Sequence, residues 1–253
     1  MSLSSPAPAV ASWTKTWALK EGLKVQFEAQ TSSTNSLAKD DSNPVTKPTL
    51  ESGHVSEPTL YLSEVQTAGR GRGTHTWSGA PGALFSTWSY ALNFPPQPIL
   101  SPLVGLALYN AASTAFPGVL FNLKAPNDLY IGEKKLAGLL IETVMTGDEV
   151  VCAIGLGLNA GHAPQELEAQ ATGLSDHFKG ELNEAAWTRF LTLVKENFAH
   201  AVKDARSDSM RMDVRTRLVN ALNLHPLLKE PVLVIDEFGQ IHTPSKTIFW
   251  HQL

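Results

Sequence analysis

Short segments of the chain alternate apolar and polar residues, a pattern typical of strands with one buried face. Seven segments show it: residues 23–29, 59–66, 83–92, 119–124, 129–131, 135–144 and 150–159. The last three are separated by joins of only a few residues. Because such short joins connect antiparallel neighbours, they predict an antiparallel meander.

Helical signals occur at three places. Residues 32–35 offer N-cap side chains for a short helix over residues 36–39. Ser101 is expected to cap a helix that begins at Pro102, since proline is favoured at the first helical position. Asn183 is expected to cap the clearest helix of the chain, in which apolar residues recur at helical spacing and mark a core-facing stripe.

The rest of the chain has weaker patterns. Residues 1–22 are expected to form a flexible N-terminal segment, and the polar, proline-containing residues 40–58 an exposed loop. After the main domain at residues 23–205, residues 206–253 predict a short cap or degenerate small β domain. Its three strand-like pieces are residues 232–235, 240–242 and 247–251. The predicted class is α+β: a mixed, largely antiparallel sheet with helices on one face and a small C-terminal β appendage.

Composition narrows the class of protein. The 253 residues, 43% of them hydrophobic and 17% charged, suit one main core. No apolar run reaches the roughly 18 residues needed to cross a bilayer, and the start lacks the pattern of a secretory signal. Cys152 is the single cysteine and lies in an apolar run, where it fits as a small buried hydrophobe. We therefore expect a cytoplasmic protein that does not contact a membrane.

The distribution of charge indicates an anionic ligand. The net charge of −4 argues against a surface that follows a nucleic-acid backbone. Residues 65–127 contain no Asp or Glu, whereas they include Arg70, Arg72, His75 and Lys124. An anion would meet little repulsion there.

The strongest local motif is the glycine- and arginine-rich segment at residues 66–73, directly after a predicted strand. Its glycines let the backbone approach a ligand, and Arg70 and Arg72 supply donors suited to phosphate or carboxylate. Gly-Arg segments also occur in disordered RNA-binding regions and in plain flexible turns. From this segment alone, these interpretations explain the residues about as well as a ligand-binding loop does. Trp77 and the strand that follows place the segment inside a folded sheet, which favours a ligand loop.

A second motif joins residues 124–128 to the strand that begins at Lys135. An isolated lysine on a strand is usually a solvated edge residue. Here Ala137 is expected on the same face as Lys135, and Gly138 leaves the backbone open, so a ligand could lie flat on this strand. Lys135 would then be a point charge beside it.

The third motif is Gly155 and Gly157 on the next strand. Relief of crowding in a twisted sheet explains these glycines at least as well as ligand contact, although the neighbouring Lys135 strand favours contact. The sequence has no zinc-ligand spacing, no phosphate-binding Gly-Lys-Ser/Thr and no Gly-x-Ser-x-Gly. Catalysis would therefore rest on positioning and charge neutralisation, without a covalent nucleophile.

Taken in order, five motifs closely resemble the biotin protein ligase family: residues 33–35, 66–73, 124–128, 135–138 and 155–159. The resemblance covers roughly residues 25–205 and is far more specific than any single motif. It implies a fold related to lipoate ligases and class II synthetases. It also implies an ATP-dependent ligase that activates biotin as biotinyl-adenylate, with Mg²⁺ accompanying ATP. The implied partner is the biotin carboxyl carrier protein domain of a biotin-dependent carboxylase, whose lysine receives the biotin, and a homodimer is left open.

The resemblance also implies roles for particular residues. The biotin site would be formed by Ser33, Thr34, Asn35, Gln66, Gly69, Arg70, Gly71, Arg72, Trp77, Lys135, Gly155 and Gly157. Nucleotide contacts would come from Arg70, Arg72, Asn127, Asp128 and Asn159. Arg72 and Lys135 would be catalytic, with Lys135 balancing charge as the biotin carboxylate attacks the α-phosphate. The protein alone would hold no metal, and Asp128 is the candidate contact for ATP-bound Mg²⁺.

Three features depart from the family pattern. Gly73-Thr74-His75 follows Arg72 where a further arginine is frequent, so adenylate retention is expected to be looser. Ala125 stands where a tryptophan is common, and the C-terminal barrel is short or degenerate, which affects acceptor docking. Only about 22 residues precede the first predicted strand, too few for a helix-turn-helix domain, so no DNA binding is expected.

Two other functions are kept beside this one. Lipoate or octanoate transfer on the same fold would need a pocket for a linear chain, and titration with biotin and with lipoate separates the two. A non-catalytic RNA-binding module would use the Gly-Arg segment, and RNA retention without ATP turnover would favour it.

Overall fold

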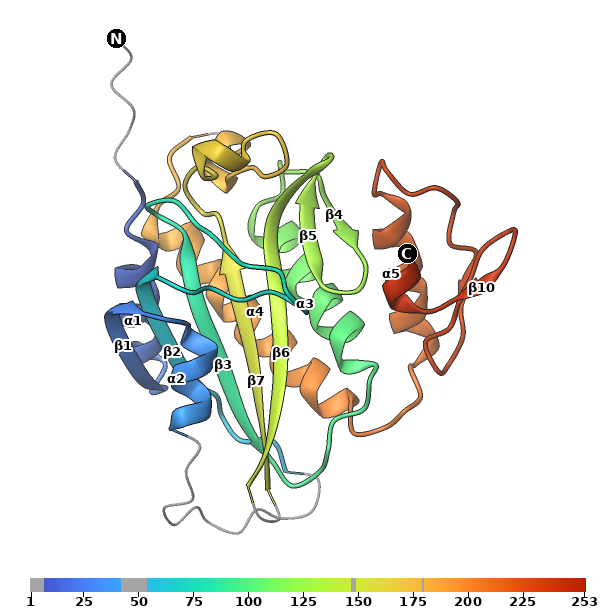
Figure 1. The fold of residues 1–253 in the computed structure, drawn as a ribbon, viewed down its shortest axis with the longest axis horizontal. Coiled ribbons are helices and arrows are strands. Elements are labelled where there is room, and N and C mark those ends of the chain that lie inside the picture. Colours follow the sequence, from blue (N-terminus) through green and yellow to red (C-terminus); the bar gives the residue numbers. More distant parts are fainter. Residues whose placement is uncertain (1–6, 42–53, 147–148, 179) are drawn as a thin grey trace.

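The computed structural model describes residues 7–41, 54–146, 149–178 and 180–253. Its main sheet has seven strands in the order β1-β2-β3-β7-β6-β5-β4 (Figure 1). Only β1 and β2 pair in parallel; the other neighbours are antiparallel. The strands are β1 (Lys24–Thr31), β2 (Thr59–Gln66), β3 (Leu84–Leu92), β4 (Phe121–Lys124), β5 (Asp128–Ile131), β6 (Lys134–Thr146) and β7 (Glu149–Leu158). The predicted mixed, largely antiparallel sheet is confirmed, and β5, β6 and β7 form the expected meander.

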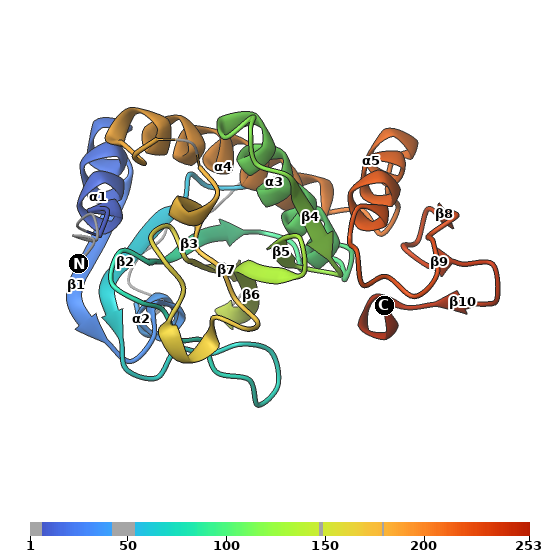
Figure 2. The ribbon, with the colours of Figure 1, turned by 90° about the horizontal axis from the view of Figure 1, so that it is seen from above.

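Long helices cover one face of this sheet (Figure 2). They are α1 (Val10–Lys20), α3 (Leu100–Ala115) and α4 (Glu184–Asp204). Side chains alternate across the sheet, so Leu60 and Leu62 of β2 enter the main core, whereas Tyr61 joins a small second cluster with Ala38 and Ala153. Ala38 belongs to the short helix α2 (Thr34–Asp40), which therefore lies on the opposite face. That face is the one left open for a site.

The N-terminal segment differs from the expectation of an irregular, flexible stretch, because residues 10–20 form helix α1. Val10, Thr14, Trp17 and Ala18 make its buried stripe. Thr14 Oγ1 accepts a hydrogen bond from the Trp187 indole of α4 at 2.9 Å. The polar Thr14 interrupts an otherwise apolar stripe, so the periodicity of apolar residues does not reveal this helix.

The C-terminal region corrects another expectation, since it opens with helix α5 (Met212–Asn223). The small β appendage is confirmed as a three-stranded sheet of β8 (Val234–Ile235), β9 (Ile241–His242) and β10 (Thr247–Ile248). His225, just after α5, is buried and lies 2.6 Å from Asn122 on β4 through Nδ1 and Oδ1. This contact fastens the C-terminal region to the edge of the main sheet.

Smaller differences concern helix starts and loops. Helix α3 begins at Leu100, so Ser101 lies inside the helix and does not act as its N-cap. Helix α2 begins at Thr34 rather than at residue 36. Short 3₁₀ turns are η1 (Gln165–Leu167), η2 (Leu174–Asp176) and η3 (Trp250–Gln252). Of the loop expected at residues 40–58, residues 42–53 lie outside the described residues. No described helix is long and apolar enough to cross a membrane.

Candidate functional site

A cavity of about 320 Å³ lies on the α2 face of the main sheet. Its wall is built from the start of α2, the end of β2, the following loop, the segment before β5, and β6 and β7. The predicted site residues that line it are Ser33, Thr34, Asn35, Gln66, Arg70, Gly71, Arg72, Trp77, Asn127, Asp128, Lys135, Gly155 and Gly157. The motifs that are far apart in sequence therefore meet at one place.

The glycine- and arginine-rich segment forms a tight hairpin over residues 70–76. Arg70 and Thr76 pair as an antiparallel bridge, and the Gly71 N–H donates to the His75 carbonyl at 2.8 Å. Gly73 turns the chain with φ of +60°. At the base, the Trp77 N–H donates to the Gly69 carbonyl at 2.9 Å. Gly69 is buried and does not line the cavity. Its role in the structure is to accept this hydrogen bond at the base of the hairpin.

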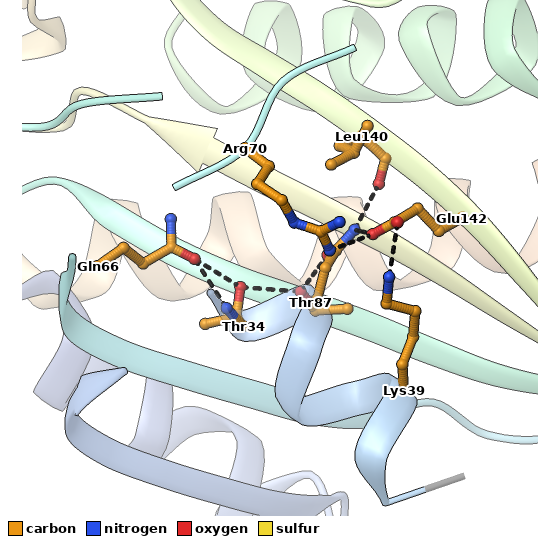
Figure 3. A network of polar contacts seen from close by, with 8 residues as sticks. Thr34, Lys39, Gln66, Arg70, Thr87, Leu140 and Glu142 are labelled. Carbon is orange, nitrogen blue, oxygen red and sulfur yellow. Dashed lines mark hydrogen bonds and ion pairs between the residues drawn. The ribbon is translucent and has the colours of Figure 1, made fainter. Parts of the chain in front are cut away.

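One end of the cavity carries a chain of hydrogen bonds (Figure 3). The Gln66 Oε1 atom accepts from the Thr34 N–H at 2.8 Å, so a side chain of β2 caps α2 from outside the helix. Thr34 Oγ1 lies 3.2 Å from the same oxygen and 2.9 Å from Thr87 Oγ1. The Thr87 hydroxyl lies 2.6 Å from Asn35 Oδ1 and donates to it. The three residues Thr34, Asn35 and Thr87 are buried, so this end is a rigid polar lining.

The chain of hydrogen bonds continues to Glu142 on β6. Asn35 Nδ2 donates to the Leu140 carbonyl at 3.2 Å and to Glu142 Oε2 at 2.8 Å. Lys39 Nζ lies 2.8 Å from Glu142 Oε1, and Arg70 Nη2 lies 2.9 Å from Oε2. Burial raises the pKa of Glu142, but the hydrogen bonds from Lys39 and Asn35 and the charges of Arg70 and Lys39 together hold it below its ordinary value. Glu142 is therefore ionised at neutral pH.

The other end of the cavity carries Lys135. Its Nζ lies 2.7 Å from Asp128 Oδ2 and 5.6 Å from the centre of the Trp77 ring. A Cβ atom at Gly138 would lie 3.1 Å from Lys135 Nζ, so the space that this glycine leaves is used by the Lys135 side chain. A Cβ at Gly157 would collide with the Trp77 indole, which explains a glycine there.

Ala137 departs from the prediction that it shares the face of Lys135. It is fully buried in the main core, whereas Lys135 lines the cavity. The pairing of β5 with β6 shifts register here: Leu129 faces Ala137, but Tyr130 faces Lys135. Leu136 is the extra residue of a β-bulge, so the two-residue alternation is broken between positions 135 and 137.

The two predicted asparagines are both buried, but only one reaches the cavity. Asn127 lines it and donates from Nδ2 to the Leu139 carbonyl. Asn159 is not among the lining residues and donates to the Thr172 carbonyl at 3.2 Å. Among the described residues neither Oδ1 has a hydrogen-bond partner.

Sequence reasoning missed several residues of the site. Thr87, Lys39 and Glu142 hold its polar end, and Leu140 lines its wall. The two-residue period of β6 could have found two of them, because Leu140 and Glu142 follow Gly138 on the same face. His75, Thr76 and Lys124 also line the cavity. In the parts of the chain that the structure describes, no group of three or more His, Cys, Asp or Glu side chains could hold a metal ion.

Comparisons with known proteins show which proteins the chain resembles. The family model for the biotin/lipoate A/B protein ligase family matches residues 27–159. A biotin--[acetyl-CoA-carboxylase] ligase of Mycobacterium tuberculosis is 33% identical over 156 residues, which cover 58% of this chain and 53% of that protein. The bifunctional ligase/repressor BirA of Bacillus subtilis is 30% identical over 157 residues, 58% of this chain and 47% of that protein. The chain thus matches about half the length of these curated relatives.

Solved structures match over more of the chain. The biotin protein ligase from Aquifex aeolicus in complex with biotin and ATP superposes with a TM-score of 0.63 and 20% sequence identity. That match covers 89% of this chain and 94% of the other. The ligase from Leishmania major in complex with biotinyl-5-AMP gives a TM-score of 0.54 and 20% identity, and the match covers 88% of this chain and 97% of the other. At this identity the likeness shows the fold.

Proposed function

Because the chain belongs to the biotin/lipoate A/B protein ligase family, we propose that it is a biotin protein ligase. It would activate biotin with ATP to biotinyl-adenylate and transfer the biotin to a lysine of a biotin carboxyl carrier protein domain. The names of the relatives that match over about half their length support this assignment. We place the reaction in the cytoplasm.

The observation that carries the proposal is the polarity of the cavity. One end offers the fixed amides and hydroxyls of Thr34, Asn35 and Gln66, which suit a polar ring with both donors and acceptors. Both Asn35 amide hydrogens are already used, so Asn35 offers a ligand only its Oδ1 acceptor, which suits a ureido N–H. A linear lipoyl or octanoyl chain would offer no groups for the hydrogen-bonding capacity that these residues have left, and a polar group that loses water without gaining a partner costs about 1–3 kcal/mol.

The cavity wall also carries cationic side chains. Lys135 is balanced by Asp128 and Arg70 by Glu142. Arg72 and Lys124 also line the cavity, and neither forms an ion pair with a described acidic residue. Two cations that form no such ion pair suit a carboxylate and a phosphate brought together.

The chemistry needs no nucleophile from the protein. The biotin carboxylate oxygen forms a bond to the α-phosphorus of ATP, and the bond from that phosphorus to the bridging oxygen breaks, which releases pyrophosphate. Lys135 and Arg72 stabilise the negative charge that builds on the phosphoryl oxygens. In the second step the amine of the acceptor lysine attacks the biotinyl carbonyl carbon, loses a proton, and AMP leaves.

Mg²⁺ would arrive with ATP, neutralising its phosphate charge. Asp128 is the carboxylate at the cavity wall, and its Oδ2 is engaged by Lys135. The Oδ1 atom of Asp128 remains available to the ion, and the phosphate oxygens would supply most of the other ligands.

Biotin-dependent exchange of pyrophosphate into ATP tests the proposal. We expect exchange that requires biotin, and calorimetric titration that shows binding of biotin and none of lipoate. Exchange that requires lipoate or octanoate instead of biotin would show that the chain is a lipoate or octanoate ligase. No exchange with any of these acids would refute ligase activity.

A further inference from the structure

Glu142 does not line the ligand cavity, but it is bonded to two residues that do. Its Oε2 atom receives both the Asn35 amide and the Arg70 guanidinium. Asn35 belongs to the polar end of the cavity and Arg70 to the hairpin over residues 70–76. One carboxylate therefore connects the two parts of the site (Figure 3).

The first of these contacts fixes the orientation of the Asn35 amide. Its Nδ2 faces the Leu140 carbonyl and the Glu142 carboxylate, and both of these groups can only accept. The reversed amide would set Oδ1 against these two acceptors. Glu142 thus keeps the Asn35 oxygen turned towards Thr87 and the cavity.

The second contact holds the hairpin. Among the described residues, the Arg70 to Glu142 ion pair is the hydrogen bond by which a side chain of residues 70–76 reaches the sheet. A second cavity, of about 450 Å³, lies against the hairpin and is lined also by Leu140 and Glu142. The Arg70 to Glu142 ion pair therefore bridges the hairpin to β6 beside an unfilled space.

Lys39 gives Glu142 a second cationic partner besides Arg70. It binds the other carboxylate oxygen, Oε1, so Glu142 keeps a cationic partner when Arg70 is turned away. Arg70 can therefore leave Glu142 for an anion in the ligand cavity, whose lining it also joins, without leaving a half-buried carboxylate unpaired.

We propose that Glu142 is a positioning residue that orients the Asn35 amide and, through Arg70, holds the hairpin to β6. The polar end of the cavity and the position of the hairpin thus depend on the same carboxylate. The part of this proposal that concerns biotin rests on the proposed function; the part that concerns the hairpin does not.

Hydrogen exchange of the hairpin amides in the free protein tests the second part. In Glu142→Gln the charge for Arg70 is lost, and we expect the amides of Gly71 and Trp77 to exchange about threefold to tenfold faster, the range for a partly exposed charge-assisted bond. Glu64→Gln, an exposed carboxylate of the same sheet, is the matched control and should leave them unchanged. Arg70→Gln should reproduce the increase.

The double variant decides whether the two residues act together. If Glu142 works through Arg70, then adding Glu142→Gln to Arg70→Gln changes the hairpin exchange by less than about twofold, since coupled residues are not additive. Equal hairpin exchange in Glu142→Gln and wild type, or full additivity in the double variant, would overturn this half of the proposal.

The Asn35 half is tested by a pair of variants at one position. Gln at position 142 still accepts from Asn35, whereas Leu does not. We expect Glu142→Leu to raise KM for biotin about tenfold more than Glu142→Gln does, with kcat changed little between them. Equal KM values would overturn this half. If the wild-type protein shows no biotin-dependent exchange at all, the proposed function fails, and the hydrogen-exchange experiments still decide the hairpin contact.

Discussion

Replacement of Lys135 by alanine separates the chemistry of the site from its stability. The Lys135 ammonium lies 2.7 Å from Asp128, and the two side chains are 30% and 24% exposed. For a pair this accessible to solvent, the loss of the ion pair should cost at most about 1 kcal/mol of folding free energy. Lys135→Ala should therefore remain folded, with a melting temperature within a few degrees of wild type.

The loss of activity should be much larger. A charge aimed at the phosphoryl oxygens acts mainly in the transition state, where removal of one such donor costs about 3–4 kcal/mol, or roughly 10²–10³ in rate. The assay is biotin-dependent exchange of pyrophosphate into ATP, followed over a range of biotin concentrations. Lys134→Ala is the control, because Lys134 is the exposed neighbour on the same strand. A folded Lys135→Ala with exchange within about threefold of wild type would show that Lys135 does not serve the reaction.

Four further outcomes are expected. Arg72→Gly should still form adenylate but release it about tenfold to a hundredfold faster, because a charge-assisted bond to the phosphate is lost, and biotinylation of an unrelated protein measures the leak. Trp17→Ala should lower the free energy of unfolding by about 3–5 kcal/mol in denaturant titration, and no change would mean that α1 is not part of the core. Burial raises the pKa of Cys152 to about 12, so a thiol reagent should modify it only as fast as the protein unfolds, and rapid labelling of native protein would contradict this. Since the pKa of Glu142 is lowered from 4.5, its contribution to hairpin protection should be constant at neutral pH and be lost as pH falls below that value, a loss that Glu142→Gln should not show.

The sequence predicts the sheet well because the alternation of apolar and polar side chains is a local property of each strand and can be recognised within a few consecutive residues. It predicts the meander of β5, β6 and β7 and the small C-terminal sheet for the same reason. Helix α1 is not predicted because its stripe contains the polar Thr14. The Thr14 hydroxyl donates to the Val10 carbonyl within the helix and accepts from the Trp187 indole on α4, far along the chain. The N-terminus of α2 is similar, since its cap comes from Gln66 and not from its own hydroxyls.

The residues of the site that belong to ordered motifs could be predicted from the sequence. The residues that hold those motif residues in place through side-chain contacts could not. Thr87 and Lys39 lie in no motif, and they join the site only through bonds across the sheet. Asn159 belongs to a motif, but its side chain is used to hold the segment at Thr172. A motif thus marks a place in the fold, and contacts across elements determine which side chains of that place face a ligand.

Strand β6 shows how the fold brings both ends of the site onto one element. Gly138, Leu140 and Glu142 face the site at two-residue intervals, whereas Ala137 is buried in the core and Leu139 belongs to the core but also borders the cavity. Strict alternation would turn Lys135 to the core with Ala137. The bulge at Leu136 adds one residue and turns Lys135 back to the cavity, where it reaches along the strand over Gly138 to Asp128. An ammonium group facing the core would have no acidic partner, and its burial would cost several kcal/mol. The bulge is therefore a requirement of the site, because it lets a regular strand present a cation and a carboxylate on the same face.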